Sequence, residues 1–366
     1  MPRISQWIMR RVGHLDSILL LLVLVLLGIS LAMVASASGQ SPARITSHVI
    51  NIGLALGVMV VFANIPPHLL SRAGLPLYVA GIVLLVAVAL FGEIRNGSRR
   101  WLNLGFMAFQ PSELLKLALP LMLAWYFQQH EAVRQARHYL IAAALLLLPF
   151  MLILRQPDLG TALMIGASGF YLLFFAGLPW KIIVGGGVIG AASLPVIWNF
   201  MHDYQQRRVL TLLDPTADPL GAGYHTLQST IAIGSGGLFG KGWMQGTQAQ
   251  LDFIPERTTD FIFAVFGEEF GLSGAVALVG LYLALVARGL VISARAPSLF
   301  GRLMAATLSL NLFTYAFVNM GMVSGILPVV GVPLPLMSYG GTALITLLLG
   351  VGILMSVATH RQLNKT

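Results

Sequence analysis

Apolar runs long enough to cross a bilayer recur along almost the whole chain, and they constrain the fold more than any other feature. About twenty apolar residues span a membrane as one helix. These runs lack the alternation of a barrel strand, and a backbone inside lipid must otherwise pair its own N–H and C=O groups within helices. A single soluble core is therefore excluded, and we expect an all-α polytopic membrane protein of about ten transmembrane helices. The expected spans are Ser17 to about Ser38, then about 46–65, 75–92, 112–127, 138–154, 160–177, 182–200, 260–287, 303–326 and 339–358.

Positive charge lies mainly at the ends of these runs, and its distribution predicts the topology. An even number of spans places both termini on one side of the membrane. If that side is the cytoplasm, the positive-inside rule is satisfied by Arg72, Arg134, Arg137, Lys181, Arg288, Arg295, Arg302, Arg361 and Lys365. Residues 1–14 then form a short amphipathic cytoplasmic lead-in. The net charge of +9 is scattered rather than clustered, which indicates topology and affinity for anionic lipid, and no nucleic-acid partner is expected.

One large extracytoplasmic loop is predicted at about 201–259, between helices 7 and 8. A loop of this length is more often functional than idle. Its segment Tyr224 to Ile233 is expected to form a short amphipathic or re-entrant helix. The Gly-rich stretch Gly234–Gly242 lacks the spacing of a P-loop, yet its backbone amides and Lys241 could hold a lipid diphosphate.

The end of this loop gathers ionisable residues at the mouth of an apolar helix. We place Asp260 in the first turn of that helix, where the helix dipole favours a carboxylate and Thr258 or Thr259 could cap the turn. An ordinary N-terminal helix charge is the competing interpretation. Glu268 and Glu269, two to three turns further in, favour a functional site because ionisable groups are costly there.

Two other polar segments precede membrane spans. Trp101 follows an arginine-rich segment, Arg95 to Arg100, and could be an interfacial anchor or a surface on which a sugar stacks. Glu113 and Lys116 are spaced i,i+3, so they share a helix face and can pair within the bilayer, either only to neutralise each other or to shape a polar cavity.

Polar residues also interrupt two further apolar stretches. Arg155 and Asp158 could form a simple loop ion pair or line the same cavity. Residues 327–342 are interrupted by Pro and Gly before the last span, which is tolerated where backbone is buried in protein or faces a water-filled cavity. Asn319 precedes this segment. The chain has no cysteine, and we find no His/Cys metal cluster, nucleophile elbow, Walker motif or dinucleotide fingerprint.

Taken together, these motifs resemble the SEDS (shape, elongation, division and sporulation) family, most closely its RodA branch. The resemblance covers nearly the whole of residues 1–366, which we treat as a single integral membrane domain. The segments that carry it are Asn96-Gly97 with Trp101, 110–116, 155–162, 214–224, Gln228-Ser229, 234–242, 246–248, Pro255-Glu256, 259–263 and 333–341.

The resemblance implies a peptidoglycan glycosyltransferase that polymerises lipid II on the outer face of the cytoplasmic membrane during cell elongation and rod-shape maintenance. Such chemistry needs a base for the acceptor hydroxyl and positive charge for the leaving diphosphate. Asp260 is the expected base. The residues expected to position substrate are Trp101, Glu113, Lys116, Arg155, Asp158, Lys241 and Arg257.

Other expectations follow from the same resemblance. The family's usual His is replaced by Thr258, a position we take as auxiliary, with His225 or water as substitutes. A divalent cation, Mg²⁺ or Mn²⁺, is a candidate for sharing charge on the diphosphate, although no residues spell a metal site. A class B penicillin-binding protein and Mre elongation proteins are the implied partners. A lipid II flippase and a non-catalytic scaffold are the alternatives.

Overall fold

A computed structural model describes residues 15–95, 98–103, 108–130, 135–156, 158–201, 203–215 and 221–363. The described chain is mostly helical. Its helices are α2 (Ser17–Ala37), α3 (Pro42–Ala63), α4 (Pro67–Phe91), α5 (Pro111–Gln129), α6 (Ala136–Leu154), α7 (Leu159–Phe175), α8 (Trp180–Phe200), α9 (Asp203–Leu213), α10 (Ala222–Ser235), α11 (Thr247–Gln250), α12 (Ile262–Arg295), α13 (Leu299–Val323) and α14 (Gly341–Leu363).

Within the described ranges, seven helices are long and apolar enough to cross a membrane: α2, α3, α4, α6, α12, α13 and α14. Helix α7 and the first part of α8 are apolar but shorter. Helix α5, which carries Glu113 and Lys116, is not among the seven. The chain is therefore a multi-pass membrane protein, whereas a full set of ten crossings remains a prediction.

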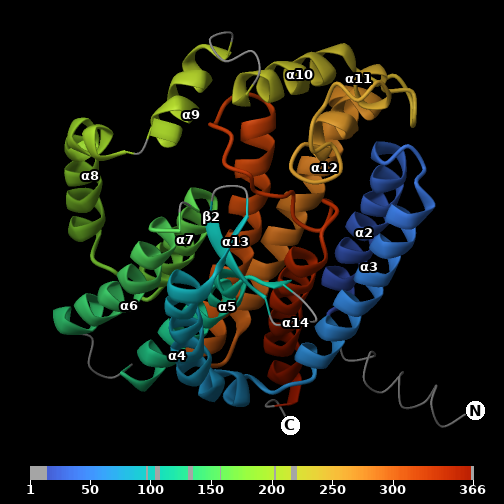
Figure 1. The fold of residues 1–366 in the computed structure, drawn as a ribbon. Coiled ribbons are helices and arrows are strands. Elements are labelled where there is room, and N and C mark those ends of the chain that lie inside the picture. The colour runs from blue at the N-terminus through green and yellow to red at the C-terminus, as the bar shows by residue number, and fades with distance from the viewer. Residues whose placement is uncertain are drawn as a thin grey trace, which may run out of the picture.

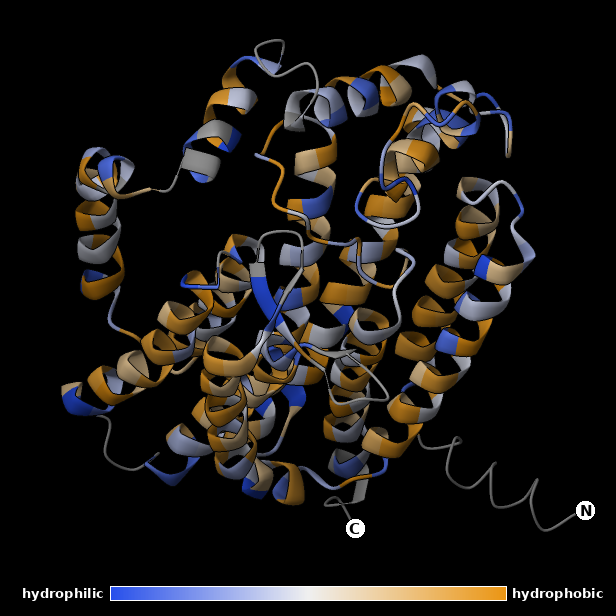
Figure 2. Cartoon of the chain, in the orientation of Figure 1, coloured by the Kyte–Doolittle hydropathy of each residue, from blue (hydrophilic) through white to orange (hydrophobic). Residues whose placement is uncertain are grey.

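Helix α13 lies in the middle of the bundle, against α12, α7 and α5 (Figure 1). Helix α14 packs along α3, and α4 packs along α5. Figure 1 shows that α2 begins and α14 ends at the same end of the bundle, while α10 and α11 cover the opposite end. The helices are apolar along most of their length, as Figure 2 shows.

Small residues allow the closest helix pairs to form. A Cβ on Gly74 of α4 would lie 2.8 Å from the Leu121 carbonyl oxygen of α5, and a Cβ on Gly81 would lie 2.7 Å from the Leu115 side chain. Lipid tails are as apolar as leucine, so close van der Waals packing rather than exclusion from water holds such helices together.

Three short strands correct the expectation of a wholly α chain. Strands β1 (Glu93–Arg95), β2 (Ser98–Asn103) and β3 (Ala108–Phe109) form an antiparallel sheet in the order β1-β2-β3 between α4 and α5. The segment is too polar to continue α4, so its backbone groups pair between strands instead. The motif residues Asn96 and Gly97 lie outside the described residues.

The predicted loop at 201–259 is not structureless where it is described. It contains α9, α10 and α11, and α10 confirms the short helix expected at Tyr224 to Ile233. Helix α10 packs on α12. The lead-in at 1–14, Arg134, Asp218, Pro219 and Lys365 lie outside the described residues, as does the Arg361 side chain.

Candidate functional site

A cavity of about 250 Å³ lies among α5, α7, α13, α14 and the segment before α14. Its apolar wall comes from leucines of α13 and α14. Its polar lining includes Arg100, Gln110, Glu113, Lys116, Asp158 and Tyr315. Ionisable side chains inside a membrane bundle are costly, so they indicate a functional site.

The expected pair of Glu113 and Lys116 forms on the first turns of α5. The Lys116 ammonium lies 2.5 Å from the Glu113 carboxylate, and both side chains are largely buried. The same ammonium lies 5.5 Å from the centre of the Tyr315 ring of α13, a cation–π contact. A buried pair is poor evidence for stability, which favours a retained role in shaping the polar cavity.

Asp158 is the N-cap of α7 and lies only 7% exposed at the cavity wall. Its carboxylate accepts hydrogen bonds from the Thr161 N–H at 3.1 Å and from the Gln110 amide at 3.2 Å. Its ion-pair partner is Arg100 of β2 at 3.7 Å, rather than the expected Arg155. Arg155 is the C-cap of α6 and is exposed. The strand β2 therefore brings a cation to the cavity that sequence spacing alone does not select.

Asp260 lies beside a smaller hollow of about 180 Å³. This hollow and the larger cavity share the lining residues Pro333, Ala343 and Leu347, so the two spaces adjoin. A Cβ on Gly331, which lines the larger cavity, would lie 3.4 Å from Asp260 Oδ2. The carboxylate is thus at the rim of the polar cavity.

The placement of Asp260 in the first turn of a helix is wrong. Helix α12 begins at Ile262, and its N-cap is Phe261, which has no side-chain cap. The backbone turns before that point, because Glu256 has a positive φ of 48° and the Phe261 N–H bonds the Glu256 carbonyl. Asp260 is positioned instead by its carbonyl, which accepts a hydrogen bond of 2.7 Å from the buried Asn319 amide.

Thr258 and Thr259 also act through their backbone rather than as caps. The Thr258 carbonyl accepts from the Tyr339 N–H at 2.8 Å, and the Thr259 carbonyl accepts from the Ser338 hydroxyl at 2.6 Å. The segment before α14 therefore forms one wall of the Asp260 site.

Burial raises the pKa of Asp260 from 3.8 to about 6, and the negative charge of Glu256 adds to the effect. The positive charge of Arg208, in α9, opposes it. Arg257, which is expected to position substrate, pairs here with Asp252 and donates to the Ala249 carbonyl. The result is a carboxylate whose basicity is close to that needed near neutral pH.

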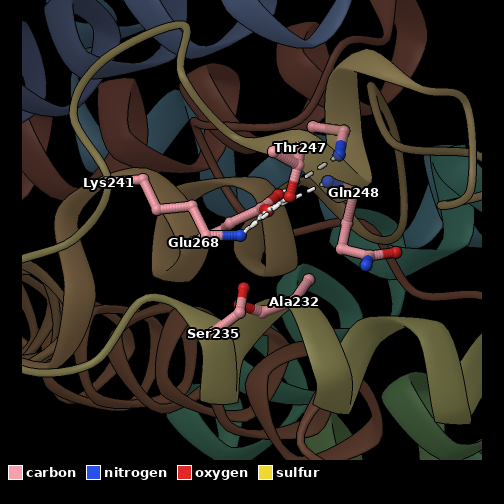
Figure 3. Close-up of polar contacts among 7 residues, drawn as sticks. Ala232, Ser235, Lys241, Thr247, Gln248 and Glu268 are labelled. Carbon is pink, nitrogen blue, oxygen red and sulfur yellow. Dashed lines mark hydrogen bonds and ion pairs between the residues drawn. The ribbon is translucent and has the colours of Figure 1, made fainter.

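Lys241 does not line the polar cavity. Its ammonium contacts the Glu268 carboxylate of α12, as Figure 3 shows. The fully buried Glu268 accepts from the Lys241 ammonium at 2.7 Å, the Thr247 hydroxyl at 3.2 Å and the Gln248 N–H at 2.9 Å (Figure 3). The neighbouring Glu269 accepts from the Ser36 hydroxyl of α2. Glu268 fastens Lys241 of the Gly-rich segment to α12, and Glu269 connects α12 to α2, so the burial of both carboxylates has a structural explanation.

The structure thus brings Glu113, Lys116 and Asp158 into one cavity and places Asp260 at its rim. Trp101 lies on β2, opposite Glu93, and does not line the cavity. Arg155, Lys241 and Arg257 do not line it either. Substrate roles for these four residues remain predictions.

Asn319, which the sequence singled out, belongs to a polar stripe on α13 whose other members, Asn311 and Tyr315, were not predicted. Asn311 and Tyr315 line the cavity, and Asn319 follows at the same spacing of four residues. Residues spaced i,i+4 lie on one helix face, so this spacing was the available signal.

The described carboxylates do not fit a protein-held divalent cation. Among the residues that the structure describes, no group of three or more His, Asp or Glu side chains could hold a metal ion. Glu113 and Asp158 each form an ion pair, with Lys116 and Arg100 respectively. We therefore derive no step through a metal.

The fold and site define a class: a multi-pass membrane protein with a buried, cation-bearing cavity and a carboxylate of raised pKa at its rim. Residues 14–363 match the FtsW/RodA/SpoVE family, described as "Cell cycle protein". The chain belongs to this family.

Similar proteins support the same conclusion. The chain is 53% identical to "Peptidoglycan glycosyltransferase MrdB" of Escherichia coli K12 over 96% of this chain and 95% of that protein. It is 35% identical to "Probable peptidoglycan glycosyltransferase FtsW" of Geobacter sp. M18, over 97% and 99% of the two chains.

Solved structures agree with the fold. A chain from "Structural coordination of polymerization and crosslinking by a peptidoglycan synthase complex" has a TM-score of 0.82 and 34% identity, over 95% of this chain and 98% of that one. The rod shape determining protein RodA of Thermus thermophilus has a TM-score of 0.72 and 31% identity, over 95% and 97%.

Proposed function

We propose that this protein is a peptidoglycan glycosyltransferase that polymerises lipid II during cell elongation and rod-shape maintenance. The observation that carries the proposal is the half-buried Asp260 carboxylate, which adjoins a cavity containing Lys116 and Arg100. Its relatives' names, given above, support the same activity.

The reaction needs a base and a cation, and the site has both. Asp260 takes the proton from the acceptor's 4-hydroxyl as that oxygen bonds to the anomeric carbon of the donor sugar. The bond from that carbon to the diphosphate breaks, and the undecaprenyl diphosphate leaves with the electron pair. Positive charge in a dry cavity stabilises the leaving diphosphate more strongly than it would in water.

Lys116 is the strongest candidate for this electrostatic role. Its partner Glu113 holds the ammonium in the cavity, and Asp158 with Gln110 holds Arg100 beside it. Trp101, Arg155, Lys241 and Arg257 are proposed to contact the parts of the substrate outside the cavity. A divalent cation, if it takes part, would be held chiefly by the diphosphate, as Mg²⁺ is in many phosphate sites.

The absence of the family's usual His does not remove the base. His225 of α10 stacks on Phe261, with ring centres 5.5 Å apart, which places an imidazole beside the residue that follows Asp260. We propose that the position of Thr258 is auxiliary and that His225 or water supports proton transfer.

Location and partners follow from the same activity. We propose that the protein lies in the bacterial inner membrane with both termini in the cytoplasm and Asp260 on the outer side. A class B penicillin-binding protein is the proposed partner, because a similar chain occurs in a synthase complex that couples polymerisation to crosslinking. Contact with Mre elongation proteins is part of the same proposal.

Polymerisation of labelled lipid II by purified protein in detergent, with and without the partner, tests the function. Asp260→Asn keeps the shape of the side chain but not its basicity, and we expect the rate to fall about 10²–10⁴-fold, the usual contribution of a general base. Asp252→Asn is the matched control, because Asp252 lies in the same segment with its side chain 77% exposed. Wild-type polymerisation by Asp260→Asn would refute Asp260 as the base.

The same assay separates the alternatives. A flippase has no leaflets to connect in detergent, and a scaffold makes no polymer there. If the wild-type protein makes no glycan with its partner but moves lipid II between the leaflets of vesicles, it is a flippase. If it does neither while still binding the partner, it is a scaffold.

A further inference from the structure

A buried histidine lies behind the wall of the Asp260 site, and the chemistry proposed above does not use it. His48 of α3 is 0% exposed. Its Nε2 lies 2.8 Å from the Ser30 hydroxyl of α2, and Ser30 in turn donates a 2.8 Å hydrogen bond to the Met337 carbonyl. Side chains of α2 and α3 therefore converge on the segment that precedes α14.

The tautomer of His48 follows from this chain of hydrogen bonds. A serine hydroxyl has one proton, and Ser30 gives it to Met337. His48 must therefore donate its Nε2–H to Ser30. The His48 Nδ1 has no hydrogen-bond partner among the described residues. The His48 imidazole therefore acts as a hydrogen-bond donor to Ser30.

The backbone at the end of this series of hydrogen bonds is strained. Leu336, next to Met337, has a φ of 61°, in the left-handed region that a leucine rarely adopts. Such a conformation costs on the order of 1–3 kcal/mol and persists only where its surroundings enforce it. The hydrogen bond to the Met337 carbonyl is one of the contacts that enforce it.

The last two residues of this turn, Ser338 and Tyr339, bond the backbone directly before Asp260. Ser338 donates to the Thr259 carbonyl at 2.6 Å, and the Tyr339 N–H donates to the Thr258 carbonyl at 2.8 Å. The Tyr339 ring lies 5.8 Å from the His48 ring, centre to centre. Leu336, Ser338 and Tyr339 line the hollow that contains Asp260.

We propose that His48 is a positioning residue: through Ser30 it fixes the turn at 336–339 and thereby fixes Asp260 at the rim of the cavity. This role rests on the proposed function, because it concerns the orientation of the proposed base. His48 touches no substrate. Its contribution is to the geometry of Asp260, where a displacement of about 1 Å can cost on the order of 100-fold in rate.

His48→Leu removes the donor and His48→Gln retains an N–H near the position of Nε2. For His48→Leu we expect kcat to fall about 10–100-fold with little change in KM, because the base rather than the binding cavity is displaced. His48→Gln should recover most of the lost rate. Ser30→Ala should resemble His48→Leu, and the double variant should be no worse than either single variant, since both changes break one chain.

His138→Leu is the matched control. His138 is 4% exposed, bonds the Tyr126 hydroxyl at 2.9 Å and has one ring nitrogen without a described partner, but it lies at the junction of α5 and α6. The His138→Leu substitution should lower the melting temperature about as much as His48→Leu does, without lowering kcat. An equal loss of kcat in His138→Leu, a wild-type kcat in His48→Leu, or no recovery in His48→Gln would overturn the proposal.

Hydrogen–deuterium exchange of the peptide spanning 334–340 separates this proposal from the proposed function. Faster exchange in His48→Leu and Ser30→Ala than in His138→Leu is expected, because the turn is held less firmly and the hydrogen bond from the Tyr339 amide to the Thr258 carbonyl opens more often. This readout does not depend on catalysis, so it remains informative even if no variant polymerises lipid II. Unchanged exchange in His48→Leu would refute the positioning role.

Discussion

Asp260 combines partial burial with a nearby negative charge, and both effects favour its protonated form. The pKa of about 6 is raised from the ordinary 3.8, so the carboxylate is a stronger base than a hydrated aspartate. Asparagine or a fully exposed aspartate at this position would lack that property.

The pH dependence of polymerisation follows from the raised pKa. Below about 6 the carboxyl carries a proton and cannot accept another, so we expect kcat/KM to rise with pH through about 6 and then to level off. Glu256→Gln removes a negative charge that raises the pKa, so it should shift this limb to lower pH. A pH–rate profile of both proteins measures the effect. If the rise in kcat/KM occurs at the same pH in Glu256→Gln as in the wild type, the Glu256 charge does not raise the pKa of Asp260.

The same shift predicts a cost in stability. Between the unfolded pKa near 3.8 and the folded pKa of about 6, the folded state binds more protons than the unfolded state, so stability from this group is lost as pH rises through that window. At pH 7.5 Asp260→Asn should therefore melt at a higher temperature than the wild type, while polymerising poorly. Thermal unfolding in detergent at pH 7.5 and pH 4 gives the comparison. An equal stabilisation at both values would show that ionisation is not the cause.

At the level of single residues, sequence patterns identified the charged residues of the cavity better than they identified the ion-pair partner of each. Glu113 and Lys116 share one helix, so their spacing predicted the pair. Asp158 takes Arg100 rather than Arg155, because a strand between two helices carries Arg100 to the cavity. Contacts across elements of this kind depend on tertiary packing, which spacing along one element does not encode.

At the level of elements, the Pro/Gly-interrupted segment at 327–340 has an irregular conformation that the sequence indicated but did not specify. Gly325, which follows the C-cap of α13, and Gly331, inside the segment, have positive φ values of 72° and 74°. Asn319 of α13 holds the segment by donating to the Val332 carbonyl at 2.7 Å while also holding Asp260. One side chain thereby sets the distance between the cavity wall and the proposed base.

Gly331→Ala and Gly325→Ala form a matched pair that tests this wall. Both positions have a similar positive φ, so alanine introduces similar backbone strain at each. Only the Gly331 methyl approaches Asp260, at 3.4 Å from Oδ2, whereas the Gly325 methyl meets methyl groups of Thr226 and Thr230. We expect similar losses of melting temperature but a fall in kcat only for Gly331→Ala. Equal kcat values for the two variants would show that the wall does not constrain Asp260.

The glycines of the Gly-rich segment have a packing role that the sequence did not indicate, whereas a diphosphate-binding role for this segment remains a prediction. Gly236 packs so tightly that a Cβ would lie 2.1 Å from the Gly267 carbonyl of α12, whereas a Cβ on Gly234 meets nothing within 4 Å. The glycines permit close contact with the helix that carries Glu268. Helix α12 itself bends at Gly271, with φ 64° and ψ −163°, which the continuous apolar run at 260–287 did not reveal.

Alanine at these two glycines should therefore have opposite effects. Gly236→Ala should destabilise the protein by about 1–3 kcal/mol, the usual cost of overpacking. Gly234→Ala lies inside α10 and should leave stability unchanged or raise it by about 0.5–1 kcal/mol, since alanine favours a helix over glycine. Thermal unfolding measures both. A stable Gly236→Ala variant would mean that the segment is not clamped onto α12.

At the scale of the whole molecule, the helices and their order were predictable, because apolar runs of membrane length determine them. Each of the ten predicted spans coincides with a helix, although boundaries differ by several residues, as for α3 and α4. The sequence predicted polar residues at membrane depth, where they are energetically costly, but it did not predict which of them line one cavity. Its enclosure depends on α13 crossing between α5, α7 and α14, a packing that no local pattern specifies.

The absence of cysteine makes the proposed topology directly measurable. Single cysteines can be placed without removing a background thiol, because the chain contains none. Four exposed residues suit this test: Gln40 between α2 and α3, Gln250 in α11, Gln135 at the N-cap of α6 and Arg295 at the end of α12. In Figure 1 the turn between α2 and α3 lies near α11, at the end of the bundle opposite the end of α14. If the termini are cytoplasmic, a membrane-impermeant maleimide should label Gln40→Cys and Gln250→Cys in intact spheroplasts. Gln135→Cys and Arg295→Cys should be labelled only after permeabilisation, because basic residues near them favour the cytoplasmic side. The reverse pattern would place the Asp260 site inside the cell, where a polymerase of extracytoplasmic glycan could not work.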